Sequence, residues 1–280
     1  MQTIYLCAIS NVESGTCNED CKFCTQSVKY KADIQRYKQK DIDTIVKEAK
    51  LAKQNQAMGF CLVTAGKGLD DKRVEFISKV AYSIKKENLD LALIACNGTA
   101  TLEQLKELKK NGIDSYNHNL ETSQEYYPNI CTTHSWEERY QTCVDVKSAG
   151  LGLVTGGIFG LGETQKDRVS MLNSIASLDP MTVPLNFFHP NEALPIVENT
   201  LTKKEAFELI SLAKSMLPNV EKLMVAGGRE VMFGDEQYEI FKYGANSIVI
   251  GNYLTTTGEN THKDIEVLTS RGYNIAKKCR

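Results

Sequence analysis

Apolar, β-branched runs alternate along the chain with longer amphipathic stretches, and the alternation repeats eight times. The short runs suit buried strands, whereas the longer stretches carry apolar residues three and four positions apart, as on one face of a helix. The predicted strands are 4–10, 60–65, 89–96, 113–120, 151–158, 182–188, 222–226 and 247–250. The predicted helices are 41–58, 69–86, 101–111, 135–149, 164–178, 202–217, 235–243 and 262–277.

Several predicted helices begin with residues that cap a helix N-terminus. Three pairs have the capping-box spacing: Thr101 with Gln104, Ser135 with Glu138, and Thr202 with Glu205. Eight strand-then-helix units favour an α/β fold, a (β/α)8 TIM-type barrel, over a doubly wound sheet, which usually has fewer strands. Because no Pro- or Ser-rich linker separates two flavodoxin-like halves, we predict a single domain over residues 1–280.

In such barrels the chemistry lies where strands end and loops begin. Cys61 and Cys96 fall within predicted strands, Asn186 lies near the end of a later strand, and Arg229 follows the next one. A single strand cysteine is more often a buried small hydrophobe than a ligand. Arg229, beside two glycines, is more often an ion-pair partner or a substrate clamp. Even so, polar residues that recur at one end of the barrel indicate a site.

Asn117, Asn119 and Glu121 alternate along the end of one predicted strand, so their side chains point to one face. Two amides and a carboxylate suit a ligand that is rich in hydroxyl groups or resembles urea. Loop capping explains the same residues equally well.

The segment 17–24 carries three cysteines, Cys17, Cys21 and Cys24, in the spacing C-x-x-x-C-x-x-C. Thiolates at this spacing converge on soft metal centres, either an iron–sulfur cluster or zinc. A structural zinc site needs a fourth Cys or His ligand nearby, and the first to follow in the chain are the distant Cys61 and Cys96. We therefore favour a [4Fe–4S] cluster with one iron open to a small molecule.

The composition is that of an ordinary globular protein, with 42% hydrophobic and 24% charged residues. The net charge of -2 gives no bulk attraction to nucleic acid or to acidic membranes. We find neither a signal peptide nor an apolar run long enough to span a bilayer. Nine cysteines in such a chain indicate metal ligands and buried thiols, so we expect a cytoplasmic protein.

The remaining cysteines and histidines lack ligand spacing, and we assign them no function. Cys131, Cys143 and Cys279 are expected in helices or loops, and His134, His189 and His262 at the surface or in loops.

With these residues assembled, the chain resembles the biotin synthase family of radical S-adenosylmethionine (SAM) enzymes. The superfamily motif is the cysteine segment with Phe23 in its aromatic position. The narrower resemblance rests on four stretches, 116–122, 156–163, 183–186 and 226–230. It covers nearly the whole chain in the same order and implies sulfur transfer to dethiobiotin, giving biotin.

The resemblance also implies roles for individual residues. Cys17, Cys21 and Cys24 ligate the [4Fe–4S] cluster, whose open iron binds SAM. Phe23 and Ile158 pack near the adenine of SAM, Asn119 and Glu121 meet its ribose, and Arg139 lies near its carboxylate. The family usually has Asp in place of Glu121. Dethiobiotin is bound by Asn117, Asn119 and Asn186. The implied partners are a flavodoxin- or ferredoxin-type electron donor and a second copy of the chain.

A second, [2Fe–2S] cluster serves as sulfur donor in this family. The resemblance places Cys61, Cys96 and Arg229 among its ligands, but Val154 replaces the remaining cysteine. If the second cluster forms, Cys7 on the first strand is the replacement ligand that we predict, although a buried thiol explains Cys7 as well.

Two other functions remain open. A radical SAM mutase or cluster maturase keeps the first cluster and needs no sulfide donor, which suits Val154. An iron–sulfur carrier without catalysis is disfavoured by the polar end of the barrel.

Overall fold

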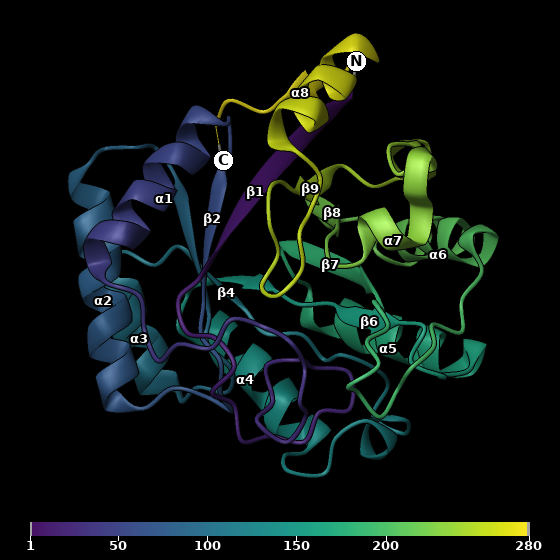
Figure 1. Cartoon of the computed structure of the whole chain (residues 1–280), viewed down its shortest axis with the longest axis horizontal. Coiled ribbons are helices and arrows are strands. Elements are labelled where there is room, and N and C mark those ends of the chain that lie inside the picture. Colours follow the sequence, from purple (N-terminus) through teal and green to yellow (C-terminus); the bar gives the residue numbers. More distant parts are fainter. Residues whose placement is uncertain (1, 279–280) are drawn as a thin grey trace.

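The computed structural model describes residues 2–278, and in this part of the chain eight parallel strand positions close into a barrel (Figure 1). In barrel order the strands are β1 (Thr3–Asn11), β2 (Gly59–Val63), β3 (Ala92–Cys96), β4 (Ser115–Asn117), β5 (Gly152–Val154), β7 (Thr182–Phe187), β8 (Lys222–Val225) and β9 (Ser247–Val249). The strand β6 (Gly157–Phe159) follows β5 and pairs with β7. Pairing of β9 with β1, Tyr5 opposite Ser247, closes the ring.

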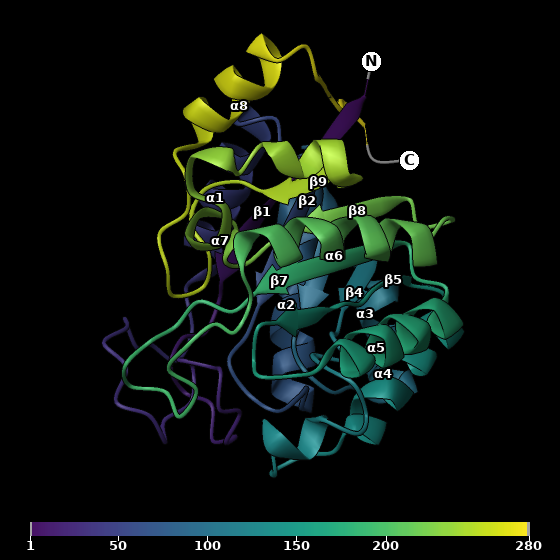
Figure 2. The ribbon, with the colours of Figure 1, turned by 90° about the vertical axis from the view of Figure 1, so that its right-hand side faces the viewer.

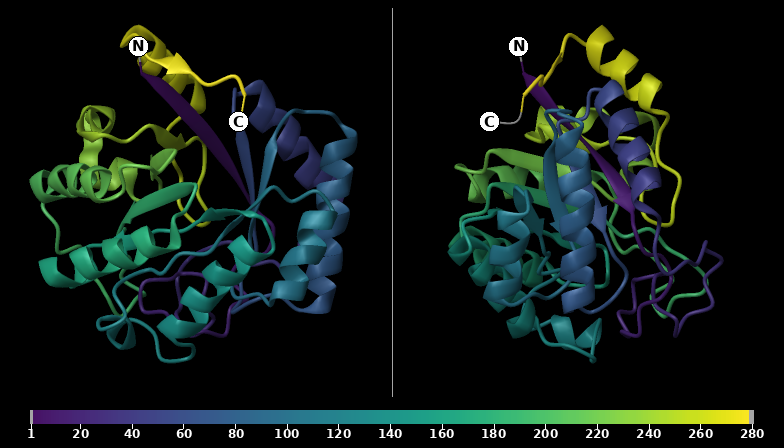
Figure 3. Two further views of the ribbon diagram at one scale, coloured as in Figure 1. Left: turned by 180° about the vertical axis from the view of Figure 1, so that it is seen from behind. Right: turned by 90° about the vertical axis from the view of Figure 1, so that its left-hand side faces the viewer.

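Helices surround the strands on the outside (Figure 3). They are α1 (Ile42–Gln54), α2 (Asp71–Lys86), α3 (Leu102–Lys110), α4 (Trp136–Ser148), α5 (Gln165–Leu178), α6 (Lys203–Met216), α7 (Arg229–Phe233) and α8 (Thr261–Ser270). The three predicted capping boxes are confirmed, because each side chain and its partner three residues later bond to one another's backbone. No helix among the described residues has the length and apolar character needed to cross a membrane.

The strands bury both faces, as parallel strands do. On β1, Ile4 and Leu6 belong to the core beneath the helices, whereas Tyr5, Cys7 and Ile9 line the barrel interior. The predicted (β/α)8 barrel is confirmed. The long loop after β1, residues 12–40, which we call the cluster loop, lies at the end of the barrel opposite α8 (Figure 2).

The predicted strand 151–158 is interrupted between β5 and β6. The interruption includes Gly156, where a Cβ atom would lie 1.9 Å from the backbone oxygen of Pro184. Only glycine permits this close approach of β7.

Two helix predictions differ from the structure in the last part of the chain: one helix is shorter than predicted and the other is not an α-helix. The predicted helix 262–277 ends at Ser270, after which Gly272 adopts a φ of 78° and β10 (Asn274–Ile275) pairs with β1. The predicted helix 235–243 is a pair of 3-10 helices, η2 (Gly234–Glu236) and η3 (Glu239–Tyr243). Strand pairing and glycines at positive φ overrode the helical spacing there.

Candidate active site

A cavity of about 440 Å³ occupies the barrel interior and opens toward the cluster loop. Nine of the predicted site residues line it: Phe23, Cys24, Cys61, Cys96, Asn117, Asn119, Glu121, Ile158 and Asn186. Val154, which replaces the expected cluster cysteine, lines it as well. They come from the cluster loop and from the carboxyl ends of six strands or the loops that follow them, as expected for a barrel of this type. Most of the sequence-predicted residues therefore converge on one chamber, whereas Cys17, Cys21, Arg139 and Arg229 are not among the residues that line it.

Backbone hydrogen bonds hold the cysteines of the cluster loop in a compact turn. The amide of Cys24 donates to the carbonyl of Cys21 over 3.1 Å, and Cys17 bonds through its amide to Gln26 and through its carbonyl to Val28. Burial raises the pKa of the Cys24 thiol to about 12. Metal binding at these thiols must therefore release protons, as thiolate ligation requires.

Arg139, on α4, organises the segment after β4. Its guanidinium donates to the backbone oxygen of Asn119 over 2.6 Å, to Oε1 of Glu121 over 3.0 Å, and to Nε2 of His134 over 3.2 Å. Burial raises the pKa of Glu121, and the charge of Arg139 opposes this shift. The guanidinium thus already has three protein acceptors in the structure.

Two oxygens at this end of the cavity are buried and have no hydrogen-bond partner among the described residues. They are Oε2 of Glu121 and Oδ1 of Asn117. Buried acceptors are rarely left unpaired, and a bound ligand with hydroxyl or N–H donors would satisfy them. Glu121 also adopts a φ of 69°, a strained conformation for a residue with a side chain. These two observations favour ligand binding over loop capping and fit the ribose hydroxyls that SAM carries.

Asn119 and Asn186 are already bonded to the backbone. Oδ1 of Asn119 accepts from the amide of Gly156 over 3.1 Å. Asn186 accepts from the amide of Gly227 over 2.9 Å and donates to the carbonyl of Gly157 over 3.1 Å. Both side chains hold neighbouring strand ends in register, and their predicted ligand contacts stay a prediction.

Three thiols gather in the barrel interior: Cys7, Cys61 and Cys96, called here the lumen thiols. Cys7 and Cys61 share an apolar cluster with Val63, against which Cys96, Met224 and Leu254 pack. A hydrogen bond with Cys96 and burial raise the pKa of Cys61 well above its ordinary value. The prediction that Cys7 faces the interior is confirmed.

Arg229 does not join the lumen thiols, and we withdraw its predicted role as a ligand. It opens α7, four residues beyond the end of β8, and is fully buried. Its guanidinium forms two hydrogen bonds to Asp264 over 2.9 and 3.0 Å and a third to Glu230 over 3.1 Å. The ion-pair reading of the sequence is the one that the contacts support. The residue that β8 directs toward the thiols is Met224.

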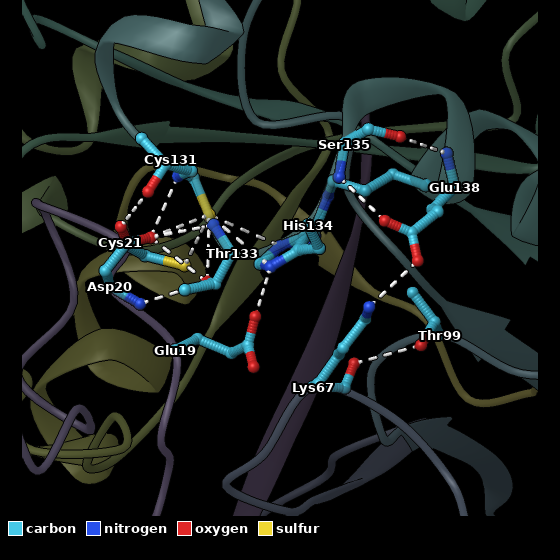
Figure 4. Close-up of polar contacts among 12 residues, drawn as sticks. Glu19, Asp20, Cys21, Lys67, Thr99, Cys131, Thr133, His134, Ser135 and Glu138 are labelled. Carbon is cyan, nitrogen blue, oxygen red and sulfur yellow. Dashed lines mark hydrogen bonds and ion pairs between the residues drawn. The ribbon is translucent and has the colours of Figure 1, made fainter.

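Two residues set aside in the sequence lie beside the cluster motif (Figure 4). The sulfur of Cys131 is 3.6 Å from the sulfur of Cys21 and 3.4 Å from Nδ1 of His134. His134 lies in the loop before α4, one of its two predicted settings, but it is buried rather than at the surface. Its Nδ1 lies 2.6 Å from Glu19. The hydrogen bond between the two thiols raises the pKa of Cys21 and lowers that of Cys131. No spacing in the sequence signals this contact, because 110 positions separate the two cysteines.

His189 and His262 are exposed, as predicted, although His189 borders the cavity. Cys143 is fully buried and donates to the carbonyl of His118. Cys279 lies outside the described residues.

The family model of the Radical SAM superfamily matches residues 14–175, and that of the Biotin and Thiamin Synthesis associated domain matches residues 184–274. Among solved structures, the barrel resembles the FeFe-hydrogenase maturase HydG from Carboxydothermus hydrogenoformans (TM-score 0.84, 17% identity, 98% of this chain and 68% of that one). It also resembles methylornithine synthase, PylB (TM-score 0.81, 18% identity, 98% and 84%). At these identities the likeness concerns the fold. Fold and superfamily match together define a radical SAM enzyme.

Curated relatives narrow the class. The chain is 66% identical over 276 residues to the biotin synthase of Aliarcobacter butzleri (strain RM4018), covering 99% of this chain and 98% of the relative. It is 59% identical over 279 residues to that of Sulfurimonas denitrificans (strain ATCC 33889 / DSM 1251), covering 100% and 99%. The chain belongs to the biotin synthase family, and it is a sulfurtransferase of biotin formation.

Proposed function

We propose that the chain converts dethiobiotin to biotin inside the barrel, with a [4Fe–4S] cluster on Cys17, Cys21 and Cys24 and SAM at the cavity mouth. The observation that carries this proposal is one continuous cavity lined both by the cluster loop and by the lumen thiols. When both are bound, the cluster and SAM would supply a carbon radical that is reactive enough to remove a hydrogen atom from an unactivated C–H bond. The apolar walls of the cavity exclude water from that chemistry.

SAM binding is assigned to residues at the cavity mouth. Phe23 and Ile158 line it from two sides and offer apolar surface for the adenine. The unpaired Oε2 of Glu121 accepts from the ribose hydroxyls. Arg139 holds both the Asn119 backbone and Glu121, so its main contribution is to fix their positions.

Dethiobiotin is assigned to the middle of the cavity. The unpaired Oδ1 of Asn117 is an acceptor for the N–H groups of its urea-like ring. Asn119 and Asn186 border the same space and keep the strand ends in place.

For the sulfur donor we propose a second iron–sulfur cluster on the lumen thiols Cys7, Cys61 and Cys96. Thiolates are the ligands that iron–sulfur clusters prefer, and these three lie together in an apolar part of the cavity. Val154 lines the same cavity but offers no donor atom. The family resemblance suggests the [2Fe–2S] type.

The experiment replaces one lumen thiol at a time. Cys7→Ser, Cys61→Ser and the matched buried control Cys143→Ser are purified without oxygen, and iron and sulfide are measured per chain. We expect the two lumen variants to lose part of the iron and all biotin formation while 5′-deoxyadenosine is still released. The control should keep all three quantities. Full iron content and normal biotin formation in Cys7→Ser would remove Cys7 from the site.

We further propose that residues 1–280 act as one domain, since both matched regions contribute strands to one closed sheet. A cytoplasmic location, a homodimer and a flavodoxin- or ferredoxin-type electron donor follow from the family resemblance. Gel filtration of the anaerobic enzyme tests the dimer, because a monomeric mass contradicts it.

A further inference from the structure

The contact between Cys21 and Cys131 has no role in the chemistry proposed above. Cys21 lies in the cluster loop, and Cys131 follows the 3-10 helix η1 (Tyr127–Asn129). Cys21 is partly exposed, whereas Cys131 is 2% exposed. Their sulfurs are 3.6 Å apart, so a disulfide of about 2.05 Å requires the sulfurs to approach by only about 1.5 Å.

Hydrogen bonds on both sides of the two cysteines hold their backbones together. The amide of Lys22 donates to the carbonyl of Ile130 over 2.9 Å. The carboxylate of Asp20 accepts from the amides of Thr132 and Thr133 over 2.9 and 3.2 Å. Figure 4 shows this carboxylate beside Cys131 and Thr133. Because the segments are already fixed side by side, cross-linking costs little additional chain entropy in the folded protein.

The sulfur of Cys21 has one thiol partner within hydrogen-bond distance in residues 2–278, and that partner is Cys131. The nearest rival in sequence is Cys24, with which Cys21 forms a C-x-x-C pair. The polar neighbours of Cys131, His134 and Asp20, contact its sulfur at 3.4 Å each and orient it beside Cys21.

We propose that Cys21 and Cys131 form a reversible disulfide whenever Cys21 is not bound to iron, with oxidised glutathione as oxidant. The partly exposed thiol of Cys21 loses its proton and attacks one sulfur of oxidised glutathione, and one glutathione thiolate is released. The buried Cys131 thiolate then attacks the sulfur of Cys21, and the second glutathione leaves. Two thiols lose two electrons and two protons, and one oxidised glutathione becomes two reduced ones.

Iron ligation and this disulfide exclude one another, because both use the same sulfur. The disulfide therefore keeps Cys21 in an oxidised form that a dithiol reductant converts back to the free thiol. A lone Cys21 thiolate is open to sulfinic and sulfonic acid formation, which is irreversible in most proteins. The proposal requires only that Cys21 is an iron ligand and is independent of the substrate assigned to the cavity.

The test uses the full-length, cluster-free chain incubated with oxidised glutathione, then alkylated, digested and analysed by mass spectrometry. We expect a cross-linked peptide pair containing Cys21 and Cys131 to be the dominant disulfide. A dominant Cys21–Cys24 or Cys17–Cys21 bond, or no internal disulfide, would overturn the proposal.

A matched pair of variants adds a second measurement. Cys131→Ser and the buried control Cys143→Ser are exposed to peroxide, reduced with dithiothreitol and reconstituted with iron and sulfide. We expect the control to recover its iron content, and Cys131→Ser to recover at most half because Cys21 is over-oxidised. Equal recovery in both variants would show that Cys131 does not protect Cys21.

Discussion

Thiols occupy two parts of this barrel in very different surroundings. The cluster loop is polar and irregular, and hydrogen bonds to its backbone hold its three cysteines in a turn. The lumen thiols come from three neighbouring strands and pack against Val63, Met224 and Leu254. A loop motif can bring its own ligands together, whereas strand residues meet only when the whole sheet closes. The first site is therefore local to the sequence, and the second is a property of the barrel.

The first prediction removes a ligand from the loop. Cys21→Ala is expected to abolish both SAM cleavage and biotin formation, because two remaining thiolates do not hold the cluster. The measurement is 5′-deoxyadenosine and biotin by chromatography, with Cys143→Ala as the control. Continued 5′-deoxyadenosine release would refute the assignment of the loop.

The second prediction tests whether Arg229 stabilises the fold or binds a metal cluster. Arg229→Met leaves Asp264 as an uncompensated buried charge, which costs about 3–5 kcal/mol of unfolding free energy. Iron content per folded chain should not change. Denaturant unfolding and iron analysis measure the two effects.

A double variant serves as the control for Arg229. Arg229→Met with Asp264→Leu replaces the ion pair by apolar groups and should recover much of the lost stability. If Arg229→Met instead lost iron at normal stability, the ligand role would have to be restored.

The third prediction concerns the mouth of the cavity. Glu121→Gln removes the charge that pairs with Arg139 and one ribose acceptor, so the dissociation constant of SAM should rise about tenfold, or about 1.4 kcal/mol. Equilibrium binding of SAM to the reconstituted enzyme measures this change. Glu121→Asp is the matched control and should stay near the parent value, since the family usually has Asp there. Unchanged affinity in Glu121→Gln would show that the carboxylate does not touch SAM.

The fourth and smallest effect is expected at Val154, where the barrel offers room for another thiol. Val154→Cys should retain the iron and sulfide content of the parent or increase it slightly, because the side chain already lines the cavity. Elemental analysis and the visible absorption of the anaerobic protein measure the change. A loss of iron in this variant would place the second cluster away from β5.

Local patterns in the sequence predicted most of the fold. Capping pairs such as Ser135 with Glu138 act within one turn, so they are readable before the fold is known. The end of α8 was not readable, because pairing of β10 with β1 joins the two ends of the chain. The helical spacing continues past Ser270, but this long-range pairing makes the segment a strand instead of a helix.

The candidate site likewise contains residues that the sequence reveals and contacts that it does not. Cys17, Cys21 and Cys24 are visible as a motif, and the inward position of Cys7 follows from strand alternation. The partner of Arg229 is Asp264, 35 positions away on another helix, and that of Cys21 is Cys131. Single-sequence patterns carry no distance information at such separations. The pattern around Arg229 suggested an ion pair without naming Asp264, the family resemblance assigned Arg229 to a metal, and Cys131 was given no role.

The direction of β1 has a practical consequence for tethering this enzyme. Its first residue, Thr3, and β10 lie at the end of the barrel opposite the cluster loop (Figures 1 and 2). The nine residues of β1 span about 30 Å. A flexible Gly/Ser linker extends about 5–6 Å times the square root of its length, so roughly 30 residues are needed to cover that span. An electron-transfer protein fused to either end with a short linker would therefore be held away from the cluster, whereas a surface anchor placed there would leave the mouth facing solution.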